Sequence, residues 1–191
     1  MKKIAMLLLV SLATISCSSD DAEATPVVPT PITDTNTMKV YNYPSNTEIT
    51  NGSVVTFTGS AGLVDPTNAL KFYFKNTSSS EMKVKLRVVS LSGVSDTDAV
   101  TFCYGPNTNE GVCLQGSALT VGNSYPRNDE SQIIVPANGT AGTGGANKFQ
   151  NTAEPVSPAT TVDYVLEAFQ EDANGNEVGN KVRFTYRYNA I

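Results

Sequence analysis

Four segments of the chain alternate between apolar and polar residues with a period of two. They are residues 70–75, 82–89, 162–169 and 181–188. In the first, Phe72 and Phe74 stand on either side of Tyr73. Successive side chains of a β-strand point to opposite faces, so this pattern predicts strands with one buried and one solvated face. We expect all four in antiparallel sheets that cover a core on one side.

Six further segments carry weaker strand signals: residues 39–43, 53–58, 99–103, 112–115, 131–135 and 147–151. Turn-forming pairs separate the segments, among them Asn51-Gly52, Asn138-Gly139 and Asn174-Gly175. No window of ten residues shows the 3.6-residue period of an amphipathic helix, so almost no helix is expected. About seven to nine strands at this spacing predict an all-β protein built as an antiparallel β-sandwich.

The first sixteen residues have the layout of a secretory signal. Met1-Lys2-Lys3 is a positive start, and the run from Ile4 to Ala13 is apolar except for Ser11. The run is too short to span a bilayer as a helix. A buried N-terminal helix is the alternative, but nothing near residue 20 would cap it. Residues 1–16 are therefore expected to be a cleaved signal peptide.

The residues that end in Cys17 resemble the lipobox of bacterial lipoproteins, in which a small residue precedes an acylated cysteine. Thr14 departs from the family, which most often has leucine there. The resemblance implies lipid attachment at Cys17, and with it a membrane partner through the N-terminal lipid. More than one acyl chain holds a protein firmly, because each buried methylene contributes about 0.8 kcal/mol.

The stretch after the cysteine, Ser18-Ser19-Asp20-Asp21, looks like the acidic export signal of surface lipoproteins from Bacteroidota-type bacteria. A short acidic run is also an ordinary solvated linker, so both interpretations stay open. We expect a lipid-anchored location at the outer membrane, with display at the cell surface. Residues 17–37 contain three prolines and no periodic apolar pattern, which predicts an extended, flexible tether. The β-sandwich domain would then cover residues 38–191.

Cys103 and Cys113 remain as a pair once Cys17 carries lipid. In an oxidising compartment such a pair forms a disulfide, and closing a loop of about eleven residues contributes roughly 2.8 kcal/mol in the chain-entropy model. A metal pair is the alternative. The chain has no histidine, and the mature domain has no third cysteine to complete a metal site. We expect neither a metal nor another cofactor.

The second half of the chain carries short motifs in this order: Phe102-Cys103-Tyr104-Gly105, Cys113, Ile133 and Val135, Val162-Asp163-Tyr164, and Val182-Arg183-Phe184-Thr185-Tyr186. Their order resembles the immunoglobulin-like domains of secreted and surface proteins of the same bacteria, over roughly residues 70 to 188. Asn- and Gly-rich stretches at 104–128 and 136–153 depart from that family. The resemblance implies a non-catalytic sandwich whose relatives share no single ligand. It also places the strand at 161–169 between those at 82–90 and 181–188.

That strand order would set an acidic row with Asp163 and Glu167 between two basic rows. A basic ligand patch is one interpretation; cross-strand ion pairs, each contributing a few tenths of a kcal/mol, are the expected one. Without Lys2 and Lys3 the chain has 11 basic and 18 acidic residues, a formal charge of −7. This charge argues against nucleic acid as a partner and against anionic lipid held by a basic patch.

The chain lacks the residue types that most catalytic arrangements require. Without histidine there is no Ser-His-Asp triad and no imidazole base. The glycine-rich run at 139–148 lacks the Gly-Lys-Ser/Thr ending of a phosphate loop, so it is expected to be a mobile loop. Asp96 and Asp98 could serve a glycosidase only in a deep cleft, and we expect a polar turn there. The chain is therefore predicted not to be an enzyme.

The segment Asp172–Asn176 has oxygen-bearing side chains at alternate positions, as the start of a calcium loop does. No glutamate follows at the required distance. Asn-Gly between two alternating strands is also a strong hairpin signal. A turn is expected, and weak calcium binding stays open.

The segment from Tyr104 to Arg127 would be restrained by the disulfide, and Tyr104, Tyr125 and Arg127 are its candidate binding residues. We expect a non-catalytic binding or structural accessory protein with a protein or glycan partner. A glycan-binding accessory lipoprotein beside a transporter is the first alternative, and a hydrolase of envelope glycans or peptides is the second. Two convergent carboxylates in a cleft would favour the hydrolase; a flat exposed row of tyrosines would favour glycan binding.

Overall fold

Two β-sheets with a shared core make up the part of the chain that the structure describes. The computed structural model describes residues 36–59, 69–93, 100–105, 111–115, 119–151 and 161–190. The predicted signal peptide, Cys17 and nearly all of the tether lie outside these residues, as do Asp96 and Asp98.

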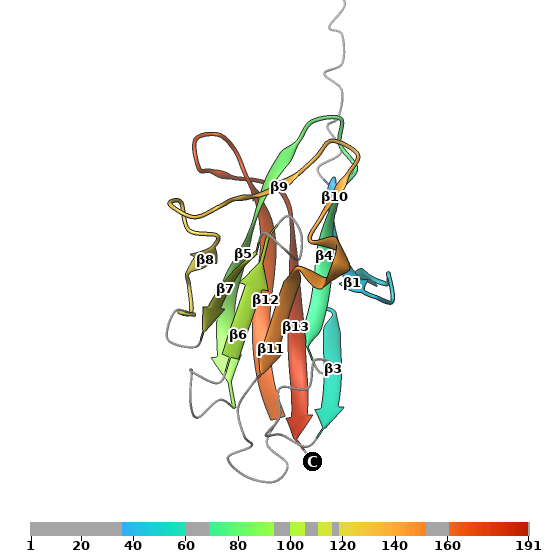
Figure 1. Cartoon of the computed structure of the whole chain (residues 1–191), viewed down its shortest axis with the longest axis vertical. Helices are drawn as coiled ribbons and strands as arrows, with labels where there is room; N and C mark the ends of the chain where they lie inside the picture. The colour runs from blue at the N-terminus through green and yellow to red at the C-terminus, as the bar shows by residue number, and fades with distance from the viewer. Residues whose placement is uncertain are drawn as a thin grey trace, which may run out of the picture. The chain divides into compact units, whose positions relative to one another are not determined.

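Sheet A has the strand order β2-β1-β4-β11-β6-β7, and β10 also pairs with β4. All its pairings are antiparallel. Sheet A faces the viewer in Figure 1. Its strands are β1 (Met38–Tyr43), β2 (Glu48–Ile49), β4 (Leu70–Asn76), β6 (Val100–Tyr104), β7 (Val112–Gln115), β10 (Thr140–Ala141) and β11 (Asn147–Asn151).

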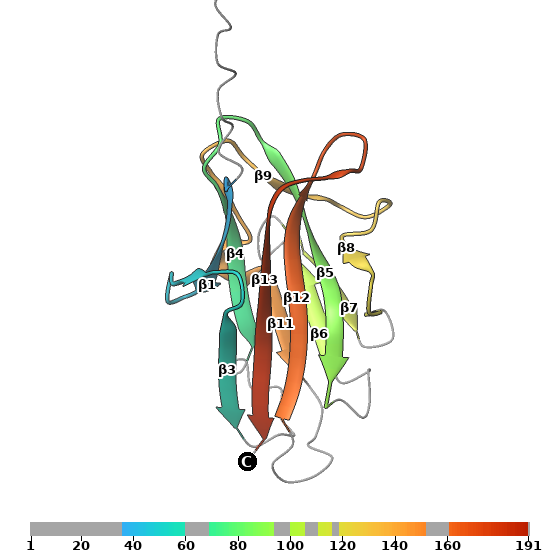
Figure 2. The ribbon, with the colours of Figure 1, turned by 180° about the vertical axis from the view of Figure 1, so that it is seen from behind.

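Sheet B has the strand order β3-β13-β12-β5-β8, and β9 also pairs with β5. It faces the viewer in Figure 2, where β3 and β13 run in the same direction at one edge. That pairing is parallel, and the other four are antiparallel. The strands are β3 (Val54–Gly59), β5 (Met82–Ser92), β8 (Ser124–Tyr125), β9 (Ile133–Val135), β12 (Thr161–Glu171) and β13 (Glu177–Ala190).

The structure confirms the all-β, immunoglobulin-like sandwich. Nine of the described strands have four or more residues, and β12 lies between β5 and β13 as expected. The parallel β3–β13 pair departs from the fully antiparallel prediction. The only helical element in the described ranges is a three-residue 3-10 turn, η4 (Thr143–Gly145). No helix among the described residues is long and apolar enough to cross a membrane.

Aromatic side chains from both sheets meet in the core. Phe149 of β11 lies 4.7 Å from Tyr164 and 5.8 Å from Tyr186, measured between ring centroids, and both tyrosines belong to sheet B. Phe72 of β4 meets Phe184 of β13 edge-on at 5.8 Å. Burial of this apolar surface, at roughly 25 cal/mol per Å², is the main favourable term in folding, and tilted ring pairs add to it. Tyr164 is therefore a core residue.

In two places, two short strands pair one after the other with the same longer strand. β10 and β11 pair with successive parts of β4, and η4 forms the excursion between them. β8 and β9 pair in the same way with β5, and residues 126–132 connect them. The glycine-rich run was expected to be a mobile loop, but it forms a strand, a turn and a second strand.

Candidate functional site

The structure corrects the predicted binding residues Tyr104 and Tyr125. The two side chains are 1% and 0% exposed. Tyr104 follows Phe102 by two residues on β6 and so shares its inward face, and the Tyr125 ring lies 6.3 Å from the Phe102 ring. Arg127 is exposed, with its guanidinium 5.7 Å from the Tyr125 ring centroid. The two tyrosines therefore offer no surface to a partner.

Hydrogen bonds fix the segment that holds these residues. The Tyr104 hydroxyl donates to the Glu130 carboxylate, which also accepts from the Arg127 backbone N–H at 2.6 Å. The Tyr125 hydroxyl oxygen accepts from the Thr120 backbone N–H at 3.0 Å. The segment is therefore tied to the core by its tyrosines.

The disulfide between Cys103 and Cys113 is present in the structure. The two cysteines are direct cross-strand partners in the β6–β7 hairpin, with a Cα–Cα distance of 4.0 Å. Cys103 is buried and Cys113 is exposed. The bond fixes the pairing of two strands at one end of sheet A.

The outer face of sheet B is closed by ion pairs, which confirms that interpretation of its charged rows. Glu167 of β12 lies opposite Arg87 of β5 and Arg183 of β13, and ion-pairs with them at 2.9 and 2.6 Å. Asp163 pairs with Arg187 at 2.6 Å. All six cations on the strands of sheet B have an ion-pair partner: Lys83, Lys85, Arg87, Lys181, Arg183 and Arg187.

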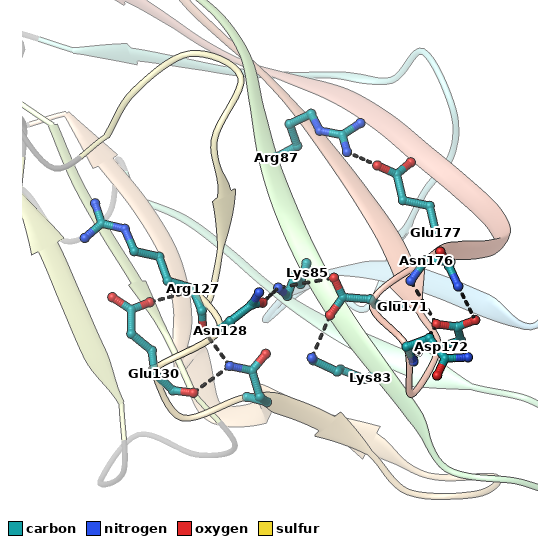
Figure 3. A network of polar contacts seen from close by, with 12 residues as sticks. Lys83, Lys85, Arg87, Arg127, Asn128, Glu130, Glu171, Asp172, Asn176 and Glu177 are labelled. Atoms are coloured by element: carbon teal, nitrogen blue, oxygen red, sulfur yellow. Dashed lines mark hydrogen bonds and ion pairs between the residues drawn. The ribbon is translucent and has the colours of Figure 1, made fainter.

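Figure 3 shows the part of this face where residues 126–132, which connect β8 and β9, lie beside β5. Glu171 forms ion pairs with Lys83 at 2.6 Å and with Lys85 at 3.3 Å. The Lys85 ammonium also donates a hydrogen bond to Asn128 Oδ1 at 2.6 Å. Lys85 was predicted to face solvent, yet it is only 4% exposed. Asn128 lies in the connection between β8 and β9, and no pattern in the sequence predicted that it reaches Lys85.

Three carboxyl groups of this face have pKa values below their usual range. Burial raises the pKa of Glu171, but its contacts with Lys83 and Lys85 outweigh that effect. Hydrogen bonds from Arg187 lower the pKa of Asp163, and hydrogen bonds from Lys181 and Arg87 lower that of Glu177. These groups are ionised at neutral pH, whereas a catalytic general acid needs a raised pKa.

The turn between β12 and β13 is held by Asp172. Its Oδ1 accepts from the backbone N–H groups of Asn174 and Asn176, both at 2.8 Å, and its Oδ2 accepts from Asn176 Nδ2 at 3.0 Å. Gly175 adopts a φ of 85°. The predicted hairpin turn is confirmed. In the described parts of the chain, no group of three or more acidic or cysteine side chains is placed to hold a metal ion.

The outer face of sheet A carries stacked tyrosines between lysines. Tyr41 of β1 lies directly opposite Tyr73 of β4, with ring centroids 5.3 Å apart and planes within 14°. On one side of this pair Lys39 lies opposite Lys75, and on the other side Lys71 lies opposite Lys148. We call this surface the Lys/Tyr face; it consists of Lys39, Tyr41, Lys71, Tyr73, Lys75 and Lys148.

Few acidic groups accompany these lysines. Glu48 is the only acidic residue on the described strands of sheet A, and it pairs with Lys39 at 3.1 Å. Among the described residues, no carboxylate forms an ion pair with Lys71, Lys75 or Lys148. The Lys/Tyr face therefore offers aromatic surface and positive charge. It was not among the predicted site residues, although the alternation in residues 70–75 contains half of it.

No protein-family model matches the chain, and no curated protein sequence matches it. Solved structures that match the chain include the N-terminal domain of PorA, with 16% sequence identity, coverage of 79% of this chain and 96% of that chain, and a TM-score of 0.48. PapD-like domain 7 of human CEP192 is 10% identical over 94% of this chain and 98% of that one, with a TM-score of 0.43. A family 123 glycoside hydrolase from Clostridium perfringens is 10% identical, covers 81% of this chain but 27% of that one, and has a TM-score of 0.44.

Proposed function

We propose that the chain is a bacterial outer-membrane lipoprotein, anchored by lipid at Cys17, whose β-sandwich is a non-catalytic binding module at the cell surface. The signal-like residues 1–16, the cysteine that follows them and the acidic residues after it support the anchor and its location. The proline-containing tether would hold the sandwich away from the membrane.

The Lys/Tyr face is the observation that carries the binding role. It gathers aromatic and cationic side chains on one outer face of the sandwich, where three lysines have no ion-pair partner among the described carboxylates. Tyr41 and Tyr73 are half-buried, and partly exposed tyrosines and cations are groups that proteins use for recognition. On sheet B the acidic groups instead stabilise the fold as ionised partners of lysine and arginine. That use supports a non-catalytic role.

The anchor is tested by replacing Cys17 with alanine in cells and separating membranes from the soluble fraction. We expect Cys17→Ala to move the protein into the soluble fraction with the Cys103–Cys113 disulfide intact, since most apolar residues of the described strands are used in the core. The matched control, Ser18→Ala, should stay with the membrane. A Cys17→Ala protein that remains in the pellet after a high-salt wash would show that the anchor is elsewhere.

A further inference from the structure

We propose that the Lys/Tyr face binds an acidic polysaccharide. Its lysines would pair with carboxylate or sulfate groups of the polymer, and Tyr41 and Tyr73 would contact the C–H faces of its sugars. The inference rests on the proposed binding role and specifies the ligand class for that same face.

The arrangement of like charges is the first argument. Lys71 lies directly opposite Lys148, and Lys39 lies directly opposite Lys75. Like charges directly opposite one another in a sheet destabilise it. Of these four lysines, only Lys39 has an ion-pair partner among the described residues. An anionic group bound between two such lysines would remove the repulsion.

Sheet B also contains like charges directly opposite each other, but there cations compensate them. Glu171 and Glu177 are direct cross-strand partners, so two carboxylates lie opposite each other there. Four cations ion-pair with the two glutamates: Lys83, Lys85, Arg87 and Lys181. The Lys/Tyr face has the same local conflict, but among the described carboxylates only Glu48 compensates it, through Lys39. Local choices that conflict with stability are expected at functional sites.

The tyrosine pair is the second argument. Along β4 the outward residues are Lys71, Tyr73 and Lys75, spaced by about 7 Å, so an aromatic row separates two rows of positive charge. The negative face of an aromatic ring attracts polarised C–H groups, which line the apolar side of a sugar. The Tyr41 hydroxyl donates to Glu48 at 3.4 Å and the Tyr73 hydroxyl donates to Asn46 at 3.2 Å. The rings are therefore oriented before a ligand arrives, which lowers the cost of binding.

A polysaccharide fits this face better than a membrane or a nucleic acid does. The large hydrophobic residues exposed in the described parts of the chain are Val54, Val121, Ile134 and Val178, and none lies on β1, β4 or β11. The face thus presents no aliphatic side chain for insertion between lipids. A nucleic-acid strand carries a charge about every 3.4 Å. The lysine rows lie about 14 Å apart along β4 with the tyrosine row between them, so a polymer on this face would need apolar sugar surface as well as charge.

The test measures binding of the full-length lipoprotein, kept in mild detergent, to immobilised polygalacturonate and to neutral dextran. We expect retention on polygalacturonate, which weakens with salt, and none on dextran. Replacing Lys71→Gln together with Lys148→Gln should weaken binding at least about tenfold, and so should Tyr73→Thr. The lysine double variant should have an unchanged or higher Tm, because it removes two opposed charges. Loss of binding without loss of stability identifies a ligand site.

The matched control is Lys83→Gln with Lys181→Gln, which removes the same charge from sheet B and should leave binding within about twofold of wild type. Three outcomes overturn the proposal: equal retention on dextran, an equal loss of binding in the control, or tighter binding to phosphatidylglycerol vesicles or single-stranded DNA than to polygalacturonate. Absence of any binding to polygalacturonate and to dextran sulfate also overturns it. Each of these leaves the Cys17 fractionation result untouched, so the anchor is judged separately.

Discussion

At the scale of single residues, Lys85 has the most unusual environment among the described cations. Its ammonium group is held between Glu171 at 3.3 Å and Asn128 Oδ1 at 2.6 Å, with only 5% of the side chain exposed. A buried charge is costly unless an opposite charge and hydrogen bonds replace its water. Glu171 supplies the charge and Asn128 the hydrogen bond. Removing either partner should therefore cost more than removing an exposed charge.

We expect Glu171→Gln to lower the free energy of unfolding by about 2 kcal/mol at neutral pH, because it leaves Lys85 buried without a carboxylate. The control is Glu177→Gln, whose side chain is 33% exposed in its pairs with Arg87 and Lys181. It should cost less than about 1 kcal/mol. Urea denaturation of both variants measures the difference. Equal costs would mean that burial of Lys85 has no energetic consequence.

The same pair predicts a pH dependence. The pKa of Glu171 in the folded protein is below its usual value of 4.5, so the stability it contributes is complete above that value and is lost as pH falls through the folded pKa. Wild type and Glu171→Gln should therefore differ most at neutral pH and converge as the pH falls through the folded pKa of Glu171. Parallel stability curves over that range would contradict the assigned ion pairs.

At the scale of elements, the excursion between β10 and β11 depends on glycine. Gly142 has a φ of 85°, and a Cβ built there would lie 2.0 Å from the side-chain nitrogen Nδ2 of Asn147. Asn147 is fully buried, and its Oδ1 accepts from the Gly105 backbone N–H at 3.2 Å. The glycine allows the chain to turn over this side chain into η4 and then rejoin β4.

Gly142→Ala should therefore destabilise the protein by about 2–4 kcal/mol, the sum of left-handed backbone strain and overpacking. Gly122 provides a matched control, since its φ is 89° and a Cβ there would meet nothing within 4 Å. Gly122→Ala should cost about 1 kcal/mol from backbone strain alone. Thermal unfolding of the two variants separates the terms, and equal shifts in Tm would refute the contact with Asn147.

The disulfide acts on the β6–β7 hairpin at one end of sheet A. Replacing Cys103 and Cys113 together with serine should lower the free energy of unfolding by about 2–3 kcal/mol, mainly through a less restricted unfolded chain. Thiol titration of the unreduced, unfolded wild type should find no reactive cysteine. Two reactive thiols would contradict the bond, and an unchanged free energy of unfolding would contradict its role in stability.

At the scale of the whole molecule, the sequence predicted which face of each long strand is buried, and hence the sandwich. The same alternation, applied to residues 99–103 and extended by one, would have put Tyr104 beside Phe102 in the core. The register between strands could not be predicted from the sequence. Lys71 and Lys148 are 77 positions apart in sequence, and only tertiary packing sets them opposite each other. The burial of Lys85 was missed for a similar reason, because residues 126–132 cover it from another part of the chain.

The two outer faces of the sandwich differ in what they do with charge. The cations of sheet B form ion pairs with acidic residues of the same sheet, whereas the outer face of sheet A carries lysines and stacked tyrosines. This asymmetry gives the proposed lipoprotein one face that stabilises the fold and another that is suited to a ligand. A lipid at the N-terminus would restrict that face to ligands near the membrane.

The intact mass of the protein purified from its own membranes tests the central claim most directly. We expect a chain that begins at Cys17, with its mass increased by a diacylglycerol group and a further acyl chain on that residue. After reduction, the two cysteines of the β6–β7 hairpin should be the only thiols. A chain that retains residues before Cys17, or one that carries an unmodified cysteine there, would contradict the account.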